Sequence, residues 1–276
     1  MQLFNFISPF EDNGRANRLK EYTLYMPASG NDPIRWLSLC GPKEASKQVI
    51  MASKGAGHEV PLPSIEKKQK YTHEIEFPSG VTADALAVAA VLKEVLSLRV
   101  GDELDCAIAL DWYKVPDPAV NSTAWNNTEI GDLIYKGKYY GTGQARNEAR
   151  NNLVRRMAWF INSHPLYRDS NRIATVPGHN ADGSSFGEKL AAAVAGQTQK
   201  NLVSTVCTSG PRPSSKEDSA SAAAATFEMP YPLDGSVIIL DDVYRTGATM
   251  RNVASAIRRA GAQRVLGLAA VRTMRN

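Results

Sequence analysis

Short runs of β-prone apolar residues recur along the C-terminal half of the chain. They lie at 172–177, 201–206, 237–240 and 264–271. The run at 237–240 has no polar alternation, which is typical of a parallel strand buried on both faces of a sheet. Segments with helical spacing of apolar residues separate the runs, so strand and helix alternate. This alternation predicts an α/β core with a parallel sheet and right-handed crossovers.

The helical segments are marked by apolar stripes. We expect helices at 186–194 and at 250–257, the second ending near Gly261, and an earlier helix with a stripe from Ala149 to Ile161. The arginines of the earlier helix stand off its stripe: Arg146, Arg150 and Arg155.

The first half of the chain has a more mixed pattern. Strand-like runs occur at 21–25, 34–39, 48–51, 73–77 and 106–110. A helix is expected at 83–98, where Thr82 can cap its N-terminus. The pattern predicts an N-terminal α+β extension over residues 1–129, whose role the residues do not specify. A second domain is expected over residues 130–276.

Composition describes an ordinary globular protein, with 43% hydrophobic and 22% charged residues and a net charge of +4. That charge supports no nucleic-acid partner. The three cysteines form neither a disulfide framework nor a CxxC metal pair. The N-terminus lacks a signal-peptide pattern, and no stretch approaches the ~18 apolar residues of a membrane span. We therefore expect a cytoplasmic protein that does not enter a membrane.

The most informative segment is the apolar run at 237–240, because Asp241 and Asp242 follow it directly. In open α/β sheets, ligands bind beyond the carboxyl ends of the strands, so the two carboxylates are expected at a binding site. Paired carboxylates suit a vicinal diol. The alternative is a strand and an acidic turn without a ligand.

A loop of small residues comes next, and a helix begins within it. Its hydroxyls and backbone N–H groups can surround an anion, and the helix adds its positive end. The loop residues are Thr246, Gly247, Ala248 and Thr249. A diol at the carboxylates and a phosphate at the loop together predict a phosphorylated sugar as the ligand.

This string resembles the signature of the type I phosphoribosyltransferases, which bind phosphoribosyl pyrophosphate (PRPP). The resemblance implies a parallel-sheet, Rossmann-like core, and Mg²⁺ that is held through PRPP without a direct protein ligand. It implies that Asp241 and Asp242 contact the ribose 2- and 3-hydroxyls. The positions that match the 5-phosphate loop are Arg245, Thr246, Gly247, Ala248 and Thr249.

Arg245 departs from the family's pattern, in which many members carry Thr, Ala, Val or Asp. Its guanidinium could add a charge-assisted contact to phosphate, crowd the sugar or point to solvent. Because arginine stays protonated, it cannot act as a general base. A dedicated role in 6-oxopurine salvage is therefore less expected.

Two more segments have counterparts in the family. The polar loop after 172–177 corresponds to a pyrophosphate-binding loop, although it lacks the arginine or lysine that many relatives place there. The resemblance assigns pyrophosphate contacts to Pro177, Gly178, His179 and Asn180. The segment 207–225, rich in Ser, Pro and Ala, corresponds to a flexible loop over PRPP, with Arg212 and Lys216 as candidate contacts; a structural linker is the alternative.

Residues 130–140 and the helix after them resemble the competence protein F subgroup of this family. The resemblance implies that Lys136, Lys138 and Tyr139 line the acceptor side. From the residues alone, a Lys- and Tyr-rich strand at a solvated sheet edge is the alternative.

Together these features predict an Mg-PRPP-binding phosphoribosyltransferase. It would transfer ribose 5-phosphate to an unidentified, nucleobase-like acceptor and release pyrophosphate. The alternative is a non-catalytic module that senses PRPP or a nucleotide and is coupled to a partner protein or nucleic acid. The enzyme is favoured, and a homodimer is left open.

Overall fold

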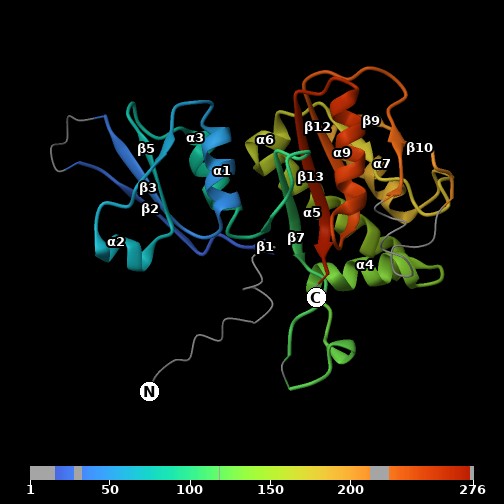
Figure 1. The fold of residues 1–276 in the computed structure, drawn as a ribbon. Helices are drawn as coiled ribbons and strands as arrows, with labels where there is room; N and C mark the ends of the chain where they lie inside the picture. Colours follow the sequence, from blue (N-terminus) through green and yellow to red (C-terminus); the bar gives the residue numbers. More distant parts are fainter. Residues whose placement is uncertain (1–15, 28–32, 118, 212–223, 274–276) are drawn as a thin grey trace. The chain divides into compact units, whose positions relative to one another are not determined.

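The computed structural model describes residues 16–27, 33–117, 119–211 and 224–273 (Figure 1). The chain divides into two compact units, one of residues 1–99 and 114–126 and one of residues 100–113 and 127–276. Arg212 and Lys216, the predicted flexible-loop contacts, lie outside the described residues. No helix within the described ranges is long and apolar enough to cross a membrane.

The second unit is built on five parallel strands in the order β7-β13-β12-β8-β9. The strands are β7 (Cys106–Trp112), β8 (Arg172–Thr175), β9 (Asn201–Val203), β12 (Ser236–Tyr244) and β13 (Arg264–Arg272). The residues at 237–240 are fully buried, as an apolar run between two neighbouring strands should be. The predicted α/β core on a parallel sheet is confirmed.

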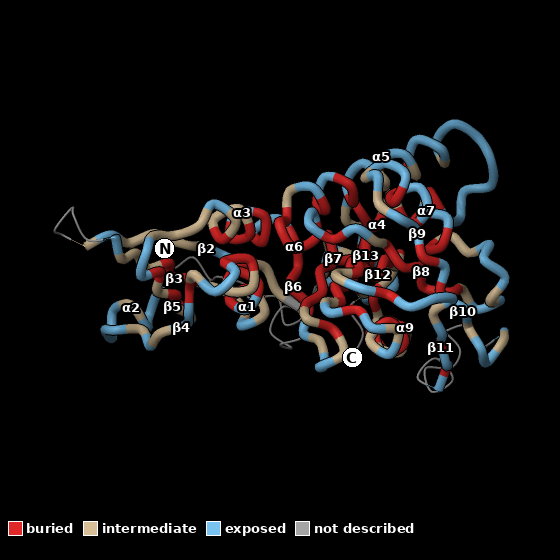
Figure 2. Tube along the Cα trace, turned by 90° about the horizontal axis from the view of Figure 1, so that it is seen from above, coloured by how far each residue is buried: buried red, intermediate tan, exposed pale blue. Residues whose placement is uncertain are grey.

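Helices cover both faces of this sheet, with α4, α5 and α7 on one face and α9 on the other (Figure 2). Their bounds are α4 (Glu129–Tyr139), α5 (Gln144–Ser163), α6 (Pro165–Arg168), α7 (Phe186–Thr198) and α9 (Ala248–Arg259). A short antiparallel pair, β10 (Val206–Cys207) with β11 (Phe227–Glu228), stands apart from the sheet.

The strand order reverses between β8 and β12, which are neighbours. From β8 the chain passes through α7 to β9, and from β12 it passes through α9 to β13 on the opposite side. The chain therefore leaves β8 and β12 toward opposite sides of the sheet, so the carboxyl ends of these two strands form its topological switch point. Switch points of this kind are where open α/β sheets bind ligands.

The Lys- and Tyr-rich segment forms helix α4, so the strand that its residues suggested is wrong. Its buried positions include Ile130, Ile134 and Gly137, at the i, i+4, i+7 spacing of a helix face. Thr128 caps the helix, because its side chain accepts a hydrogen bond from the N–H of Gly131. The cap and the helical spacing outweigh the β-preference of the tyrosines.

The first unit contains an antiparallel sheet in the order β2-β3-β5-β4, and the predicted N-terminal α+β extension is confirmed. Its strands are β1 (Ala16–Asn17), β2 (Glu21–Tyr25), β3 (Arg35–Cys40), β4 (His58–Val60), β5 (His73–Phe77) and β6 (Leu96–Leu98). Its helices are α1 (Lys43–Ala52), α2 (Ile65–Lys70), α3 (Ala83–Val91) and the 3₁₀ turn η1 (Ser122–Ala124).

Two predictions for this unit need correction. The run at 48–51 lies inside α1, because buried Ala45, Val49 and Ala52 continue a helical face around it. The helix expected over 83–98 ends at Val91, and β6 occupies its last residues. Thr82 caps α3 as expected. Residues 100–113, including β7, lie in the second unit and so precede the predicted boundary at 129.

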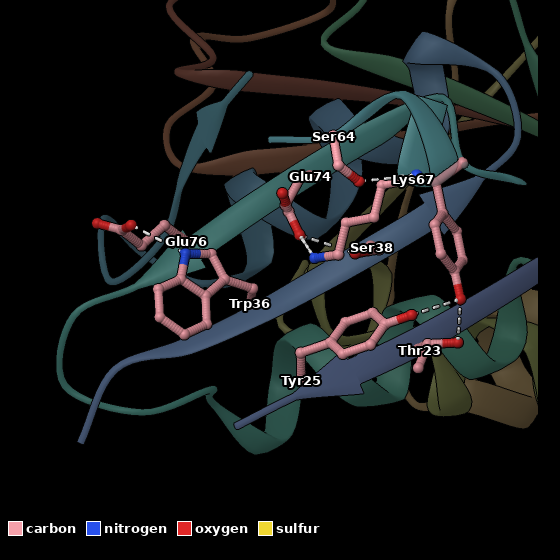
Figure 3. A network of polar contacts seen from close by, with 9 residues as sticks. Thr23, Tyr25, Trp36, Ser38, Ser64, Lys67, Glu74 and Glu76 are labelled. Atoms are coloured by element: carbon pink, nitrogen blue, oxygen red, sulfur yellow. Dashed lines mark hydrogen bonds and ion pairs between the residues drawn. The ribbon is translucent and has the colours of Figure 1, made fainter. Parts of the chain in front are cut away.

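The sheet of the first unit has one apolar and one polar face. Leu37, Leu39 and Ile75 lie in the core. On the other face, buried Glu74 accepts a hydrogen bond from Ser38 and pairs with Lys67 of α2 (Figure 3). Other contacts of this face join Trp36 to Glu76 and Thr23 to Tyr71, and place the Lys67 ammonium 4.1 Å from the Tyr25 ring centroid. These contacts fasten α2 to the sheet.

Candidate active site

The acidic pair lies near the carboxyl end of β12, at the point where the strand order reverses between β8 and β12. Asp242 is 8% exposed, and its backbone N–H donates to Asp241 Oδ1 at 2.8 Å. Desolvation, and then the charge of Asp242, raise the pKa of Asp241 well above its ordinary value. The pair therefore favours one proton on Asp241 over two full negative charges.

Lys138 of α4 supplies the counter-charge. Its Nζ lies 2.7 Å from Asp242 Oδ2. Burial lowers the pKa of Lys138, but the charge of Asp242 and this hydrogen bond outweigh it, and the net shift is upward. Lys138 thus remains an ammonium group beside the carboxylate.

The other two residues predicted for the acceptor side do not reach the acidic pair in this way. Lys136 pairs with Asp132 one turn earlier, at 2.6 Å. Tyr139 is 51% exposed, and its ring centroid lies 5.7 Å from that of Tyr135. The geometry therefore joins Lys138 to the acids and leaves Lys136 and Tyr139 on the surface of α4.

Gly187, in the first turn of α7, brings that helix against the acids. A β carbon at this position would lie 3.4 Å from Asp241 Oδ1 and 3.7 Å from Asp242 Oδ1. A side chain there would fill the space beside both carboxylates. Sequence reasoning missed this residue, because a single glycine at a helix start gives no signal of what faces it.

The loop between β8 and α7, the predicted pyrophosphate loop, is stabilised by hydrogen bonds among its own residues and the first turn of α7. Ser185 and Glu188 form a capping box, and Glu188 Oε2 also accepts from the N–H of Gly178 at 3.2 Å. Pro177 is buried, while His179 and Asn180 are exposed. The N–H of Gly178 is therefore already engaged, and the loop residues 177–185 carry no lysine or arginine.

The predicted phosphate loop turns at Gly247, where φ is +76°. Such a φ favours glycine, and a β carbon there would lie 2.1 Å from Tyr244 Oη. Gly247 is the N-cap of α9 and provides no side-chain cap; Thr246 Oγ1 accepts weakly from the N–H of Ala248 at 3.4 Å. Thr249 lies in the first turn of α9. The start of this helix thus presents donors to an anion.

Two arginines, Arg272 and Arg251, donate hydrogen bonds to backbone carbonyls of this loop. Sequence reasoning missed both. Arg272, 4% exposed at the end of β13, donates to the carbonyl of Arg245 at 3.2 Å and lies 5.3 Å from the Tyr244 ring centroid. Arg251 donates to the carbonyl of Thr246 at 3.0 Å. A charged residue ending an otherwise apolar strand was the available signal for Arg272.

Residues 145–273 match the phosphoribosyl transferase domain family. No curated protein matches the chain. The match begins after β7 and α4, so Lys138 lies outside it.

Solved structures similar to the chain include three phosphoribosyltransferases. A purine phosphoribosyltransferase from Pyrococcus horikoshii Ot3 is 15% identical over 45% of this chain and 82% of that chain, with a TM-score of 0.32. An orotate phosphoribosyltransferase from Aeropyrum pernix is 19% identical over 45% and 58%, with a TM-score of 0.30. An adenine phosphoribosyltransferase from Leishmania tarentolae is 12% identical over 63% and 94%, with a TM-score of 0.35.

Proposed function

Since the domain match supports the type I phosphoribosyltransferase family for residues 145–273, we propose that the protein binds Mg-PRPP and transfers its ribose 5-phosphate to an acceptor, releasing pyrophosphate. One observation carries the proposal: the acidic pair lies near the carboxyl end of β12, and a short loop leads from this strand to the start of α9, at the reversal of the strand order. The membership of the competence protein F subgroup stays a prediction that rests on residues 130–140.

The acidic pair is suited to a diol because its two carboxyl groups differ. Asp242, whose Oδ2 lies beside the Lys138 ammonium, can accept a hydrogen bond from one ribose hydroxyl. Asp241, with its raised pKa, can hold a proton and donate to the neighbouring hydroxyl oxygen. The loop at 246–249 and the start of α9 would bind the 5-phosphate and so fix the other end of the sugar.

Mg²⁺ would reach this site with the substrate. Mg²⁺ keeps most of its ligands from water and phosphate oxygens, so it would be held mainly through the substrate. Asp241 and Asp242 are the nearby oxygen donors in that arrangement. The ion would neutralise charge on the departing diphosphate.

Displacement at the anomeric carbon proceeds with oxocarbenium character, so the protein's contribution is positioning and electrostatic stabilisation. The acids hold the ring at its hydroxyls while the loop holds the phosphate, so the position of the anomeric carbon in the same ring is fixed. Negative charge shared by the acidic pair also favours positive charge on the sugar. Lys138, beside the acidic pair, would line the acceptor approach together with Lys136 and Tyr139.

A non-catalytic sensor of PRPP or a nucleotide is the second candidate. It is favoured by the loop at 177–185, where Glu188 already accepts from the N–H of Gly178 and no lysine or arginine is present. This loop would therefore bind pyrophosphate weakly. Weak binding disfavours an enzyme whose turnover depends on this loop to hold the leaving group.

Pyrophosphate release from Mg-PRPP, assayed over a panel of nucleobases, separates the two candidates. Release with one acceptor, abolished in the double variant Asp241→Asn with Asp242→Asn, supports the enzyme. Mg-PRPP binding with no release on any acceptor supports the sensor. Absence of both binding and release contradicts both.

A further inference from the structure

The start of α5 is built like the start of α9. Gly143 is its N-cap, with φ of +118°, and provides no side-chain cap. The preceding residues, Gly141 and Thr142, are small and exposed. Arg146, in the first turn, donates to the carbonyl of Gly141, as Arg251 of α9 does to Thr246. Both helices therefore begin with a small-residue loop that an arginine braces.

The α5 start also has two arginines close together. Desolvation, and then the charge of Arg146, lower the pKa of Arg150, so the two guanidinium groups repel one another. Within the described residues neither forms an ion pair; Arg150 donates to the carbonyl of Gly137 at 2.8 Å. Arg146 Nε is buried and has no hydrogen-bond partner. An oxyanion would relieve the repulsion between the two guanidinium groups.

The arginines lie beside the helix start that touches the acidic pair. The Arg150 guanidinium is 5.5 Å from the ring centroid of Phe186, the first residue of α7. Gly187, the next residue, approaches Asp241 and Asp242. Arg150 thus places a positive charge beside the N-terminal end of α7, next to the loop at 177–185, which has no lysine or arginine.

We propose that residues 141–146 and Arg150 form a second oxyanion site, which takes a phosphate-type group. The loop and the first turn of α5 supply backbone N–H groups and the positive helix end, and the two guanidinium groups supply charge. The group could come from the diphosphate of PRPP or from a phosphate on the acceptor. The site goes beyond the sugar cradle at β12, and its binding does not require turnover.

The direct test is calorimetric titration of the full-length protein with pyrophosphate. The double variant Arg146→Gln with Arg150→Gln should bind at least about tenfold more weakly, as expected when charge-assisted hydrogen bonds are lost. Arg155→Gln is the matched control, because Arg155 lies on the same helix, is exposed and bonds to the Asn152 side chain. Equal affinity in the double variant and the control would overturn the proposal.

A second variant protects the test against misfolding. Thr142→Glu places a carboxylate in the exposed loop without changing either arginine, and it should also weaken pyrophosphate binding about tenfold or more, with an unchanged melting temperature. If Thr142→Glu binds like the wild type, the site is not at this loop.

Saturating Mg-PRPP distinguishes the source of the anion. Loss of the Arg146- and Arg150-dependent pyrophosphate binding means that PRPP places its own diphosphate there; persistence means that the site serves a phosphate of the acceptor. Either result supports the site. Failure of the proposed function is visible separately, since Mg-PRPP would then bind equally to wild type and to the Asp241→Asn, Asp242→Asn variant.

Discussion

Lys138 Nζ lies 2.7 Å from Asp242 Oδ2, although the two residues are 104 positions apart in the sequence. Lys138 comes from α4, outside the region that matches the phosphoribosyl transferase domain, and Asp242 comes from within it. A segment upstream of the matched domain therefore supplies the cation beside the acidic pair.

Replacing Lys138 by Met should destabilise the fold, because Asp242 is 8% exposed and would lose its cation. Leaving a partly buried charge without its partner costs about 1–2 kcal/mol, after reduction for the 35% exposure of the Lys138 side chain. Urea denaturation at pH 7 measures the change. Lys136→Met, on the same helix, should destabilise the fold distinctly less, because Lys136 pairs with Asp132 at the surface of the helix. Equal losses in the two variants would show that the Lys138 contact carries no special weight.

Asp241→Asn should stabilise the protein at neutral and higher pH while weakening Mg-PRPP binding. Folded Asp241, with its raised pKa, keeps a proton that the unfolded chain loses above its ordinary pKa of 3.8. Stability contributed by this group is thus present at low pH and is lost as pH rises toward the raised pKa. The gain, at least about 1 kcal/mol, should be larger at pH 8 than at pH 5 in denaturant titrations. A variant less stable than wild type at pH 8 would contradict the assignment.

Gly247→Ala should cost more than Gly235→Ala, although both glycines have positive φ. At position 235 an added β carbon meets nothing within 4 Å, so only backbone strain of about 1 kcal/mol is expected. At position 247 the β carbon also meets the Tyr244 ring, which adds about 1–3 kcal/mol. Thermal denaturation of the two variants measures the difference. Equal losses would mean that Tyr244 does not support the loop.

His164 should make stability depend on pH below neutrality. It is fully buried, its ring centroid lies 5.5 Å from that of Phe160 and 4.9 Å from that of Tyr167, and burial lowers its pKa to about 3. The unfolded state binds the proton first, so stability is complete above about pH 6.5 and is lost as pH falls toward 3. His164→Gln should flatten this dependence by up to ~1.4 kcal/mol per pH unit. The exposed His179→Gln variant should keep the wild-type slope; an unchanged slope in His164→Gln would contradict the account.

The sheet of the second unit was largely predictable, because a strand buried on both faces must be apolar throughout. The run at 237–240 shows this most clearly, and its two carboxylates mark where it reaches the switch point. Helices were harder to predict where the segment is short or contains strand-prone residues. At 48–51 four residues favour a strand locally, and only the packing of α1 shows that they are helical.

Contacts between distant segments were not predictable. Lys138 was predicted as a site residue, but the sequence around it does not indicate that Asp242 is its partner. Gly187 and Arg146 depend on how α7 and α5 start against other elements, and one glycine or arginine among many gives no such information. The match to a phosphoribosyl transferase domain over residues 145–273 likewise leaves α4 and Lys138 outside.

Calorimetric titration with Mg-PRPP tests the central claim most directly. Wild-type protein should bind it, and the double variant Asp241→Asn with Asp242→Asn should bind at least about tenfold more weakly, while it remains folded. Equal affinity in the two proteins, or no binding by the wild type, would contradict a sugar-phosphate site at the end of β12.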